Sequence, residues 1–264
     1  MKNALKLFLG KSLVSRVINF RIKLSPDYKK NLSVKKELQN TTKRNLFYGS
    51  FIKKNDLCFD VGANVGNRID ALLESGARVV AVEPQEDCCK ILKQKFGDKI
   101  EIVPKGLGEI ESVENFHISN GNTLSSFSNE WIDSVKNNRF KEYNWDKVVK
   151  VEITTLDKLI EKYGQPAFIK IDVEGYEINV LKGLTKPVKL ISFEYTVPEL
   201  INRIIECIKQ IEKNDANIEC NYSIGESMVL ALQDWQSVEK MEKLIFTKEF
   251  VDTGFGDIYI RALS

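Results

Sequence analysis

Histidine is almost absent from this chain of 264 residues, and cysteine is present without a metal or redox pattern. His117 is the single histidine, so a metal site that needs two imidazoles is excluded. The cysteines contain no C-x-x-C pair, and their number is odd. We therefore expect free thiols in a reducing compartment, and any metal site would have to use oxygen ligands. The five cysteines are Cys58, Cys88, Cys89, Cys207 and Cys220.

Long apolar runs are also missing. No stretch reaches the roughly 18 apolar residues that a membrane-spanning helix needs. Near the N-terminus, basic side chains interrupt every apolar stretch, and no small-residue cleavage site follows an apolar core. We expect no secretory signal and a cytoplasmic location. The interrupting residues are Lys6, Lys11, Arg16 and Arg21.

The formal net charge of +2 conceals a strong asymmetry along the chain. Residues 1–54 carry 14 lysines and arginines against Asp27 and Glu37, a charge of +12, and the remainder carries −10. The aromatic residues of this basic segment are scattered and form no stacking platform, so we expect no nucleic-acid partner. The segment is either a helical extension with a solvated basic face or a weak contact with an anionic membrane surface or a polyanionic substrate.

Apolar spacing predicts the secondary structure of both parts. Apolar residues that recur every three or four positions predict a helix over 4–24. Residues 33–54 are expected to form a second, more polar helical stretch. From residue 57, strands alternate with helices, which predicts a doubly wound α/β domain over 55–264 with a mainly parallel sheet covered on both faces. Residues 119–146 show no clean period and predict an irregular insertion or lid. Expected strands are 57–61, 78–83, 99–103, 112–118, 148–154, 168–173, 190–195, 217–223, 227–232 and 256–262, and expected helices are 65–75, 85–96, 155–163, 176–183 and 198–213.

A glycine loop follows the first strand of this domain. Asp60 precedes Gly62, Asn64 and Gly66, and Glu83 ends the next strand. Ligands of such folds bind beyond the carboxyl ends of the strands, where a carboxylate can bind a ribose diol. A dinucleotide loop would have the pattern G-x-G-x-x-G, and an aspartate beside it would repel a diphosphate. The acidic loop therefore favours a cationic, phosphate-free nucleoside, S-adenosylmethionine, over a nicotinamide cofactor.

Three segments together resemble the FkbM family of class I S-adenosylmethionine methyltransferases. They are 60–66 (DVGANVG), Glu83-Pro84 and 168–177 (FIKIDVEGYE). The segments 180–183 (VLKG) and 256–259 (GDIY) also resemble the family, and the resemblance extends over about 55–262. The first segment fits many class I methyltransferases, whereas the third is more selective. The resemblance implies a Rossmann-like, seven-stranded sheet whose last strand is antiparallel. It also implies methylation of a hydroxyl oxygen, often on a sugar or a natural product.

Roles for individual residues follow from the same resemblance. The glycine loop would line the amino-acid end of the donor, and Glu83, followed by Pro84, would hold the ribose. Gly106 and Gly108 resemble the family's adenine-side segment, and Ser125 and Ser126 resemble a serine pair that closes near the donor. The loop residues concerned are Asp60, Gly62, Asn64 and Gly66.

The candidate chemistry lies where the strand 168–173 ends. A sugar hydroxyl must lose its proton as the new bond forms, so a positioned base helps. Asp172 faces the donor or the substrate, and either Asp172 or Glu174 is a candidate base, although Glu174 could instead stabilise the next helix. Lys170 is expected to point the other way and to be structural. His117 is a further candidate base, and Glu194 closes the neighbouring strand at the same edge.

Several alternatives stay open at this point. Asp172, Glu174 and Glu194 could together hold a divalent cation, although we assign no metal. Trp131 and Trp145 either stack on a sugar or form a satellite core. We expect an O-methyltransferase acting on a hydroxyl of a glycan precursor or secondary metabolite. The rival hypotheses are an NAD(P)- or nucleotide-sugar-dependent oxidoreductase and a non-catalytic module, and the sequence leaves the acceptor and the oligomeric state undetermined.

Overall fold

The computed structural model describes residues 39–121 and 123–263. Contacts divide the chain into two compact units, Met1–Leu46 and Phe47–Ser264. The helix expected over 4–24 lies outside the described residues, and of the stretch 33–54 the residues 39–49 are helical. Within the described part, no helix combines the length and the apolar character that crossing a bilayer requires.

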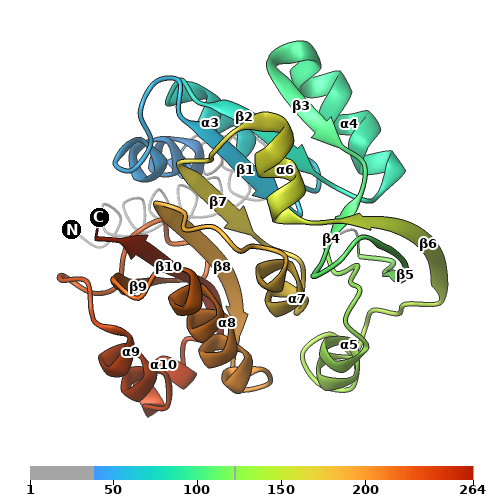
Figure 1. The fold of residues 1–264 in the computed structure, drawn as a ribbon. Helices are drawn as coiled ribbons and strands as arrows, with labels where there is room; N and C mark the ends of the chain where they lie inside the picture. The colour runs from blue at the N-terminus through green and yellow to red at the C-terminus, as the bar shows by residue number, and fades with distance from the viewer. Residues whose placement is uncertain (1–38, 122, 264) are drawn as a thin grey trace, which may run out of the picture. The chain divides into compact units, whose positions relative to one another are not determined.

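The second unit is built on a seven-stranded sheet with the order β3-β2-β1-β7-β8-β10-β9 (Figure 1). Neighbouring strands from β3 to β8 pair in parallel, whereas β10 is antiparallel to both β8 and β9. The mainly parallel sheet and its antiparallel last strand are therefore confirmed. The strands are β1 (Leu57–Val61), β2 (Arg78–Val82), β3 (Ile100–Val103), β7 (Phe168–Ile171), β8 (Leu190–Thr196), β9 (Ile218–Ile224) and β10 (Phe255–Ala262).

Both faces of this sheet are buried. Successive side chains of a strand point to opposite faces, so two neighbouring residues belong to different cores. Phe59 belongs to a core shared with α6, α7, α8, α9 and α10, while its neighbour Cys58 belongs to a core shared with 47–52, α3 and α4. Helices thus cover both faces, as expected. They are α3 (Ile69–Glu74), α4 (Glu86–Phe96), α6 (Leu156–Tyr163), α7 (Glu177–Lys182), α8 (Ile201–Asn214), α9 (Val238–Ile245) and α10 (Lys248–Val251).

A second, three-stranded sheet lies outside the main one. Its order is β4-β6-β5, from β4 (Gly106–Leu107), β5 (Ser112–Ile118) and β6 (Lys147–Thr154). β5 and β6 form an antiparallel pair, and β6 pairs in parallel with β4. The sequence predicted β5 and β6 but not β4, because two residues are too few to show a period.

Three further segments differ from the sequence expectations. The insertion 119–146 is not wholly irregular, because it contains α5 (Asn129–Val135), whose N-terminus is capped by the Ser128 hydroxyl accepting from the Trp131 amide. Residues 227–232 form only an isolated bridge between Leu230 and Ser223 instead of a strand. Helices α9 and α10 were not predicted.

Candidate functional site

The glycine loop after β1 lies over a buried acid. The side chain of Asp60 is 2% exposed, and its Oδ2 atom has no hydrogen-bond partner. Burial raises the pKa of this carboxyl from 3.8 to about 6. A buried polar atom without a partner costs free energy unless a ligand or water supplies the missing contact. Asp60 therefore offers an unsatisfied acceptor near the end of β1, next to the start of the loop.

Both glycines of the loop have backbone angles that favour glycine, with φ of +80° at Gly62 and +83° at Gly66. A Cβ atom at Gly62 would fall 1.8 Å from the carbonyl oxygen of Asp172, and one at Gly66 would fall 2.5 Å from the Phe96 ring. The family resemblance implies that these glycines line the donor. The structure gives a protein-internal reason as well, namely close packing of the loop on the end of β7 and on α4.

Glu83, the residue after β2, holds the same loop in place through hydrogen bonds. Its two carboxylate oxygens accept hydrogen bonds from the backbone amides of Asn64 and Gln85, both at 2.8 Å. Burial raises the pKa of this carboxyl. Each oxygen has a second lone pair, so the carboxylate could also accept from a ribose diol. Pro84 lies between Glu83 and Gln85, the N-cap residue of α4.

Close side-chain packing accounts for Gly106, which lies in β4 of the second sheet, and for Gly108 just after it. A Cβ atom at Gly106 would meet the side chains of Ile153 and Phe127 at 2.6 Å, and one at Gly108 would meet Ile153 at 2.9 Å. The adenine-side role that the resemblance implies for them stays a prediction.

The serine pair connects the insertion to two sides of the site. The Ser126 hydroxyl donates to the carbonyl oxygen of Glu174 at 2.7 Å, and the Ser125 hydroxyl donates to Oε1 of Gln85 at 3.3 Å. Both hydroxyls are largely buried. The pair therefore ties the insertion to the residues beside Glu83 and to the loop after β7.

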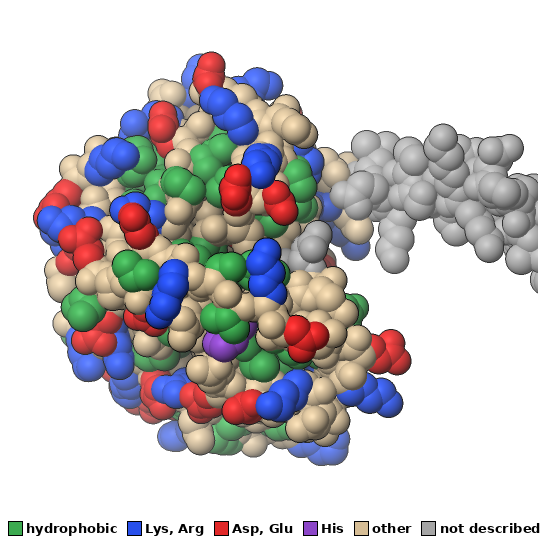
Figure 2. Space-filling view, turned by 90° about the vertical axis from the view of Figure 1, so that its right-hand side faces the viewer, with side chains coloured by type: hydrophobic (Ala, Val, Ile, Leu, Met, Phe, Trp, Pro, Cys, Tyr) green, Lys and Arg blue, Asp and Glu red, His purple; other side chains and the backbone are tan. Residues whose placement is uncertain are grey.

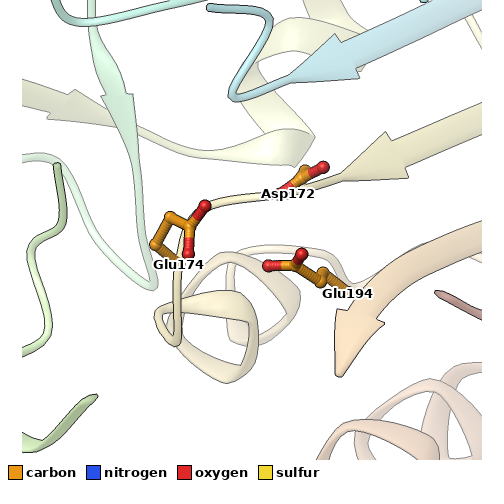
Figure 3. A group of neighbouring side chains, drawn as sticks. All are labelled: Asp172, Glu174 and Glu194. Atoms are coloured by element: carbon orange, nitrogen blue, oxygen red, sulfur yellow. The ribbon is translucent and has the colours of Figure 1, made fainter. Parts of the chain in front are cut away.

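Three carboxylates meet at the carboxyl edge of β7 and β8. Asp172 follows β7, Glu174 lies two residues further along the loop, and Glu194 projects from β8 (Figure 3). One oxygen of each lies within 4.8 Å of the others, and all three residues are half-buried. Such spacing would admit a divalent cation, but acidic groups commonly lie this close without one. The predicted grouping of Asp172 with Glu174 is present in the structure.

Each of these carboxyls has a different electrostatic environment. Burial and the charge of Asp172 raise the pKa of Glu174 and of Glu194 well above the ordinary value. Burial is also the largest influence on Asp172, but the charges of Lys170 and Arg68 and the hydrogen bonds to Lys170 and Glu194 together outweigh it and lower the pKa of that carboxyl. The edge thus combines one ionised carboxylate with two carboxyls that hold their protons to higher pH.

The prediction for the side chain of Lys170 is wrong. It was expected to point away from Asp172, yet its ammonium lies 3.0 Å from Oδ2 of Asp172 and 2.8 Å from Oδ1 of Asp257. Residues two positions apart on a strand share a face, so the alternation rule itself predicts this contact. The contact with Asp257 was not anticipated, because the two residues are 87 positions apart in the sequence.

Glu177 is a further acid of the site that the sequence analysis did not single out. Its Oε1 atom accepts from the backbone amides of Val173 at 3.2 Å and of Gly175 at 3.1 Å. Burial raises its pKa to about 7. Glu177 therefore shapes the loop that carries Glu174, whose φ of +54° is unusual for a residue with a side chain.

His117 lies in β5, where its backbone forms a bridge with Ser126. Among the described residues, the cluster of candidate ligand groups within 4.8 Å of one another consists of Asp172, Glu174 and Glu194 and does not include His117. Its role as a base stays a prediction that the geometry does not strengthen.

The two tryptophans of the insertion pack as a satellite core. Trp131 is 1% exposed, and its ring centroid lies 6.0 Å from that of Trp145 at an angle of 87°. Trp145 donates from Nε1 to the carbonyl oxygen of Leu124 at 2.6 Å. A Cβ atom at Gly175 would fall 2.4 Å from Cβ of Trp131. The structure therefore favours the core interpretation and shows that this core supports the loop beside Glu174.

A pocket opens next to the acids, between the end of β8, α8 and the loop after β7. Arg203 on its wall pairs with Glu130 of α5 and with Glu206. On the face shown in Figure 2, basic and acidic side chains are interspersed. The pocket is lined by Gly175, Glu177, Phe193, Glu194, Tyr195, Thr196, Leu200, Arg203, Ile204 and Cys207.

Comparisons with known proteins identify the family to which this chain is similar. A family model described as "Methyltransferase FkbM domain" matches residues 60–227. The chain is also 26% identical over 143 residues to the hexuronic acid methyltransferase AglP of Haloferax volcanii. That match covers 53% of this chain and 55% of the relative, so the chain spans about half the length of the curated relative it matches.

Solved structures similar to this chain include two methyltransferases. One is a TehB-like SAM-dependent methyltransferase from Corynebacterium glutamicum, with a TM-score of 0.43, 8% identity, and coverage of 90% of this chain and 100% of the other. The second is precorrin-6y C5,15-methyltransferase from Geobacter metallireducens, with a TM-score of 0.43, 7% identity, and coverage of 86% of each chain.

Proposed function

The chain belongs to the FkbM methyltransferase family, and from this premise we propose that it transfers the methyl group of S-adenosylmethionine to a hydroxyl oxygen of a sugar. The acceptor would be a glycan precursor or a related metabolite. The family match supports the methyl donor over the nicotinamide cofactor that the sequence analysis kept as a rival.

The residues at the edge of the sheet fit this donor. The unpartnered Oδ2 atom of Asp60 suits the ammonium of the donor, and this buried acceptor is the observation that carries the proposal. Glu83 would bind the ribose, and the acids after β7 and in β8 suit a cationic sulfonium. The donor supplies a carbon already activated for displacement, so the protein's tasks are alignment and exclusion of water.

We place the acceptor over the mouth of the pocket beside Glu194, because the pocket itself, about 10 Å³, has room for a water molecule and not for a sugar ring. This mouth adjoins the acids, and its wall combines the polar side chains of Glu177, Glu194, Thr196 and Arg203 with apolar ones. The relative is named as a methyltransferase of a hexuronic acid, which supports a sugar as acceptor class for this chain.

The proton of the acceptor hydroxyl needs a base, and the geometry favours Glu174 or Glu194 over Asp172. Asp172 is committed to an ion pair with Lys170. A carboxyl with a raised pKa is a better proton acceptor near neutral pH than one with a lowered pKa. The sequence left Asp172 and Glu174 open as the base, and this argument favours Glu174 and adds Glu194.

The proposal is tested by transfer of a labelled methyl group from S-adenosylmethionine to a panel of sugar acceptors. The panel includes neutral sugars, uronic acids and sugars on lipid carriers. Product that resists mild base is a methyl ether, as expected for a hydroxyl acceptor, whereas base-labile product is an ester. Glu194→Gln and Glu174→Gln should each reduce turnover by about 10²–10⁴-fold with donor affinity changed much less. Transfer only to a carboxylate would contradict the hydroxyl assignment.

A further inference from the structure

Lys170 is a buried cation that joins β7 to β10 of the main sheet. Its side chain is 1% exposed. From β7 it reaches Asp172 at the end of its own strand and Asp257 on β10, which is separated from β7 by β8. In the strand register it lies opposite Asp60 on β1 and Ser192 on β8. The ammonium is thus the centre of a polar layer beneath the carboxyl edge.

The charged and titratable groups around this layer come from every element packed against it. Burial is the largest influence on the pKa of the lysine and lowers it, but Asp172 and Asp257 outweigh burial and hold the pKa well above the ordinary value. Arg68, the residue before α3, pairs with Glu226. Its charge favours the ionised forms of Asp60, Asp172 and Tyr48 and so acts to lower the pKa of each. The groups concerned are Tyr48, Asp60, Arg68, Asp172, Glu174, Glu177, Glu194, Asp257 and Tyr259.

We infer that Lys170 is a positioning residue of the donor site: its ammonium, anchored by Asp257, holds the Asp172 carboxylate in place at the carboxyl edge of β7. The inference rests on the proposed function, because it assumes that the donor lies at this edge. It assigns a role to a side chain that the sequence analysis had considered only structural.

The physical reason is charge compensation in a buried layer. A buried carboxylate is stable in its ionised form only if a cation or several hydrogen bonds compensate the lost hydration. Asp60 and Asp172 face the same ammonium, so removing it would leave both acids to take up protons. A protonated Asp60 no longer attracts the donor's ammonium, and an unanchored Asp172 no longer keeps a fixed orientation.

The test measures the affinity for S-adenosylhomocysteine by calorimetry at pH 6.5 and pH 8.0. In the wild-type chain the affinity should change by less than about threefold, because Asp60 is mostly ionised over this range. In Lys170→Met it should be weaker and should rise at least about fivefold with pH, because binding now requires an acid to lose its proton. Lys170→Arg keeps the positive charge and should restore the flat profile.

Two further variants separate positioning from folding. Lys170→Met combined with Asp257→Asn removes one buried charge of each sign, so it should fold even if the single variant does not, and it should show the same pH dependence. Lys105→Met breaks an exposed ion pair with Glu152 and should leave the profile unchanged. Unfolding midpoints of all variants are recorded at both pH values.

The outcomes separate a failure of the proposed function from a failure of the role assigned to Lys170. If the wild-type chain does not bind S-adenosylhomocysteine, the proposed function itself is wrong. If the wild type binds and the folded Lys170→Met variants bind equally well with a flat profile, Lys170 has no positioning role. A uniform loss of affinity with no pH dependence would also overturn the inference, since it would indicate a structural effect only.

Discussion

Gly62 and Asp172 lie in contact at the point where the donor loop meets the end of β7. A Cβ atom placed on Gly62 would fall 1.8 Å from the carbonyl oxygen of Asp172. The amide of Asp172 in turn donates to the carbonyl oxygen of Val61 at 2.9 Å. The loop that would bind the donor and the strand that carries the acids are therefore packed as one unit.

This contact predicts a large effect for Gly62→Ala. The new methyl group would overlap backbone that cannot move without shifting Asp172. Gly97→Ala is the matched control, because Gly97 also has a positive φ, +58°, but nothing lies within 4 Å of its Cβ position. We expect Gly97→Ala to cost about 1–3 kcal/mol of unfolding free energy and Gly62→Ala at least about 2 kcal/mol more. Equal losses in urea denaturation would show that the close contact is unimportant.

Asp60→Asn is expected to stabilise the ligand-free protein while weakening donor binding. The folded-state pKa of Asp60, about 6, lies above its ordinary value of 3.8. The folded state therefore binds the proton more tightly, and stability falls as pH rises from about 4 to about 6. The amide removes this loss, so at pH 8 the variant should be more stable by about 1–3 kcal/mol.

The pH dependence provides the check on Asp60. Thermal midpoints of the wild type should decline between pH 4.5 and pH 6.5 more steeply than those of Asp60→Asn, and the variant should bind S-adenosylhomocysteine at least about tenfold more weakly. A variant that is less stable at pH 8 yet binds normally would remove Asp60 from the donor site.

The sequence predicts the central sheet well because its strands are buried on both faces. Runs such as 57–61 and 78–82 are short, apolar and followed by turn residues, so their type and position follow from composition alone. Asp60 and Glu83 come to the same edge because parallel strands end on the same side. The donor loop is therefore the part of the site that local sequence specifies best.

Other features depend on contacts between distant segments. The Lys170–Asp257 pair joins residues 87 positions apart in the sequence, and no local pattern reveals it. The Lys170–Asp172 pair is different, since simple alternation would have found it. Helix α9 also had a readable signal, because its buried residues Val238, Met241 and Ile245 follow steps of three and four.

Glu83→Ala tests the ribose assignment. The substitution removes a carboxylate that accepts from the amides of Asn64 and Gln85, so loss of affinity could arise from the loop alone. We expect binding of S-adenosylhomocysteine to weaken by about 1–3 kcal/mol. Calorimetry with adenine as a second ligand separates the causes, since adenine lacks the ribose and should lose little affinity. An equal loss for both ligands would assign Glu83 to the loop only.

Removal of metal ions tests the alternative use of the acids at the edge. Because Asp172 already pairs with Lys170, we expect methyl transfer to be unchanged after treatment with a chelator and after addition of Mg²⁺. Turnover that disappears with the chelator and returns with a divalent cation would instead assign Asp172, Glu174 and Glu194 to a metal site.

The most direct test of the account is a calorimetric titration of the full chain with S-adenosylhomocysteine and, separately, with NADH. The account predicts saturable binding of one molecule of S-adenosylhomocysteine per chain, weakened by Asp60→Asn, and no binding of NADH. Binding of NADH without binding of S-adenosylhomocysteine would contradict it.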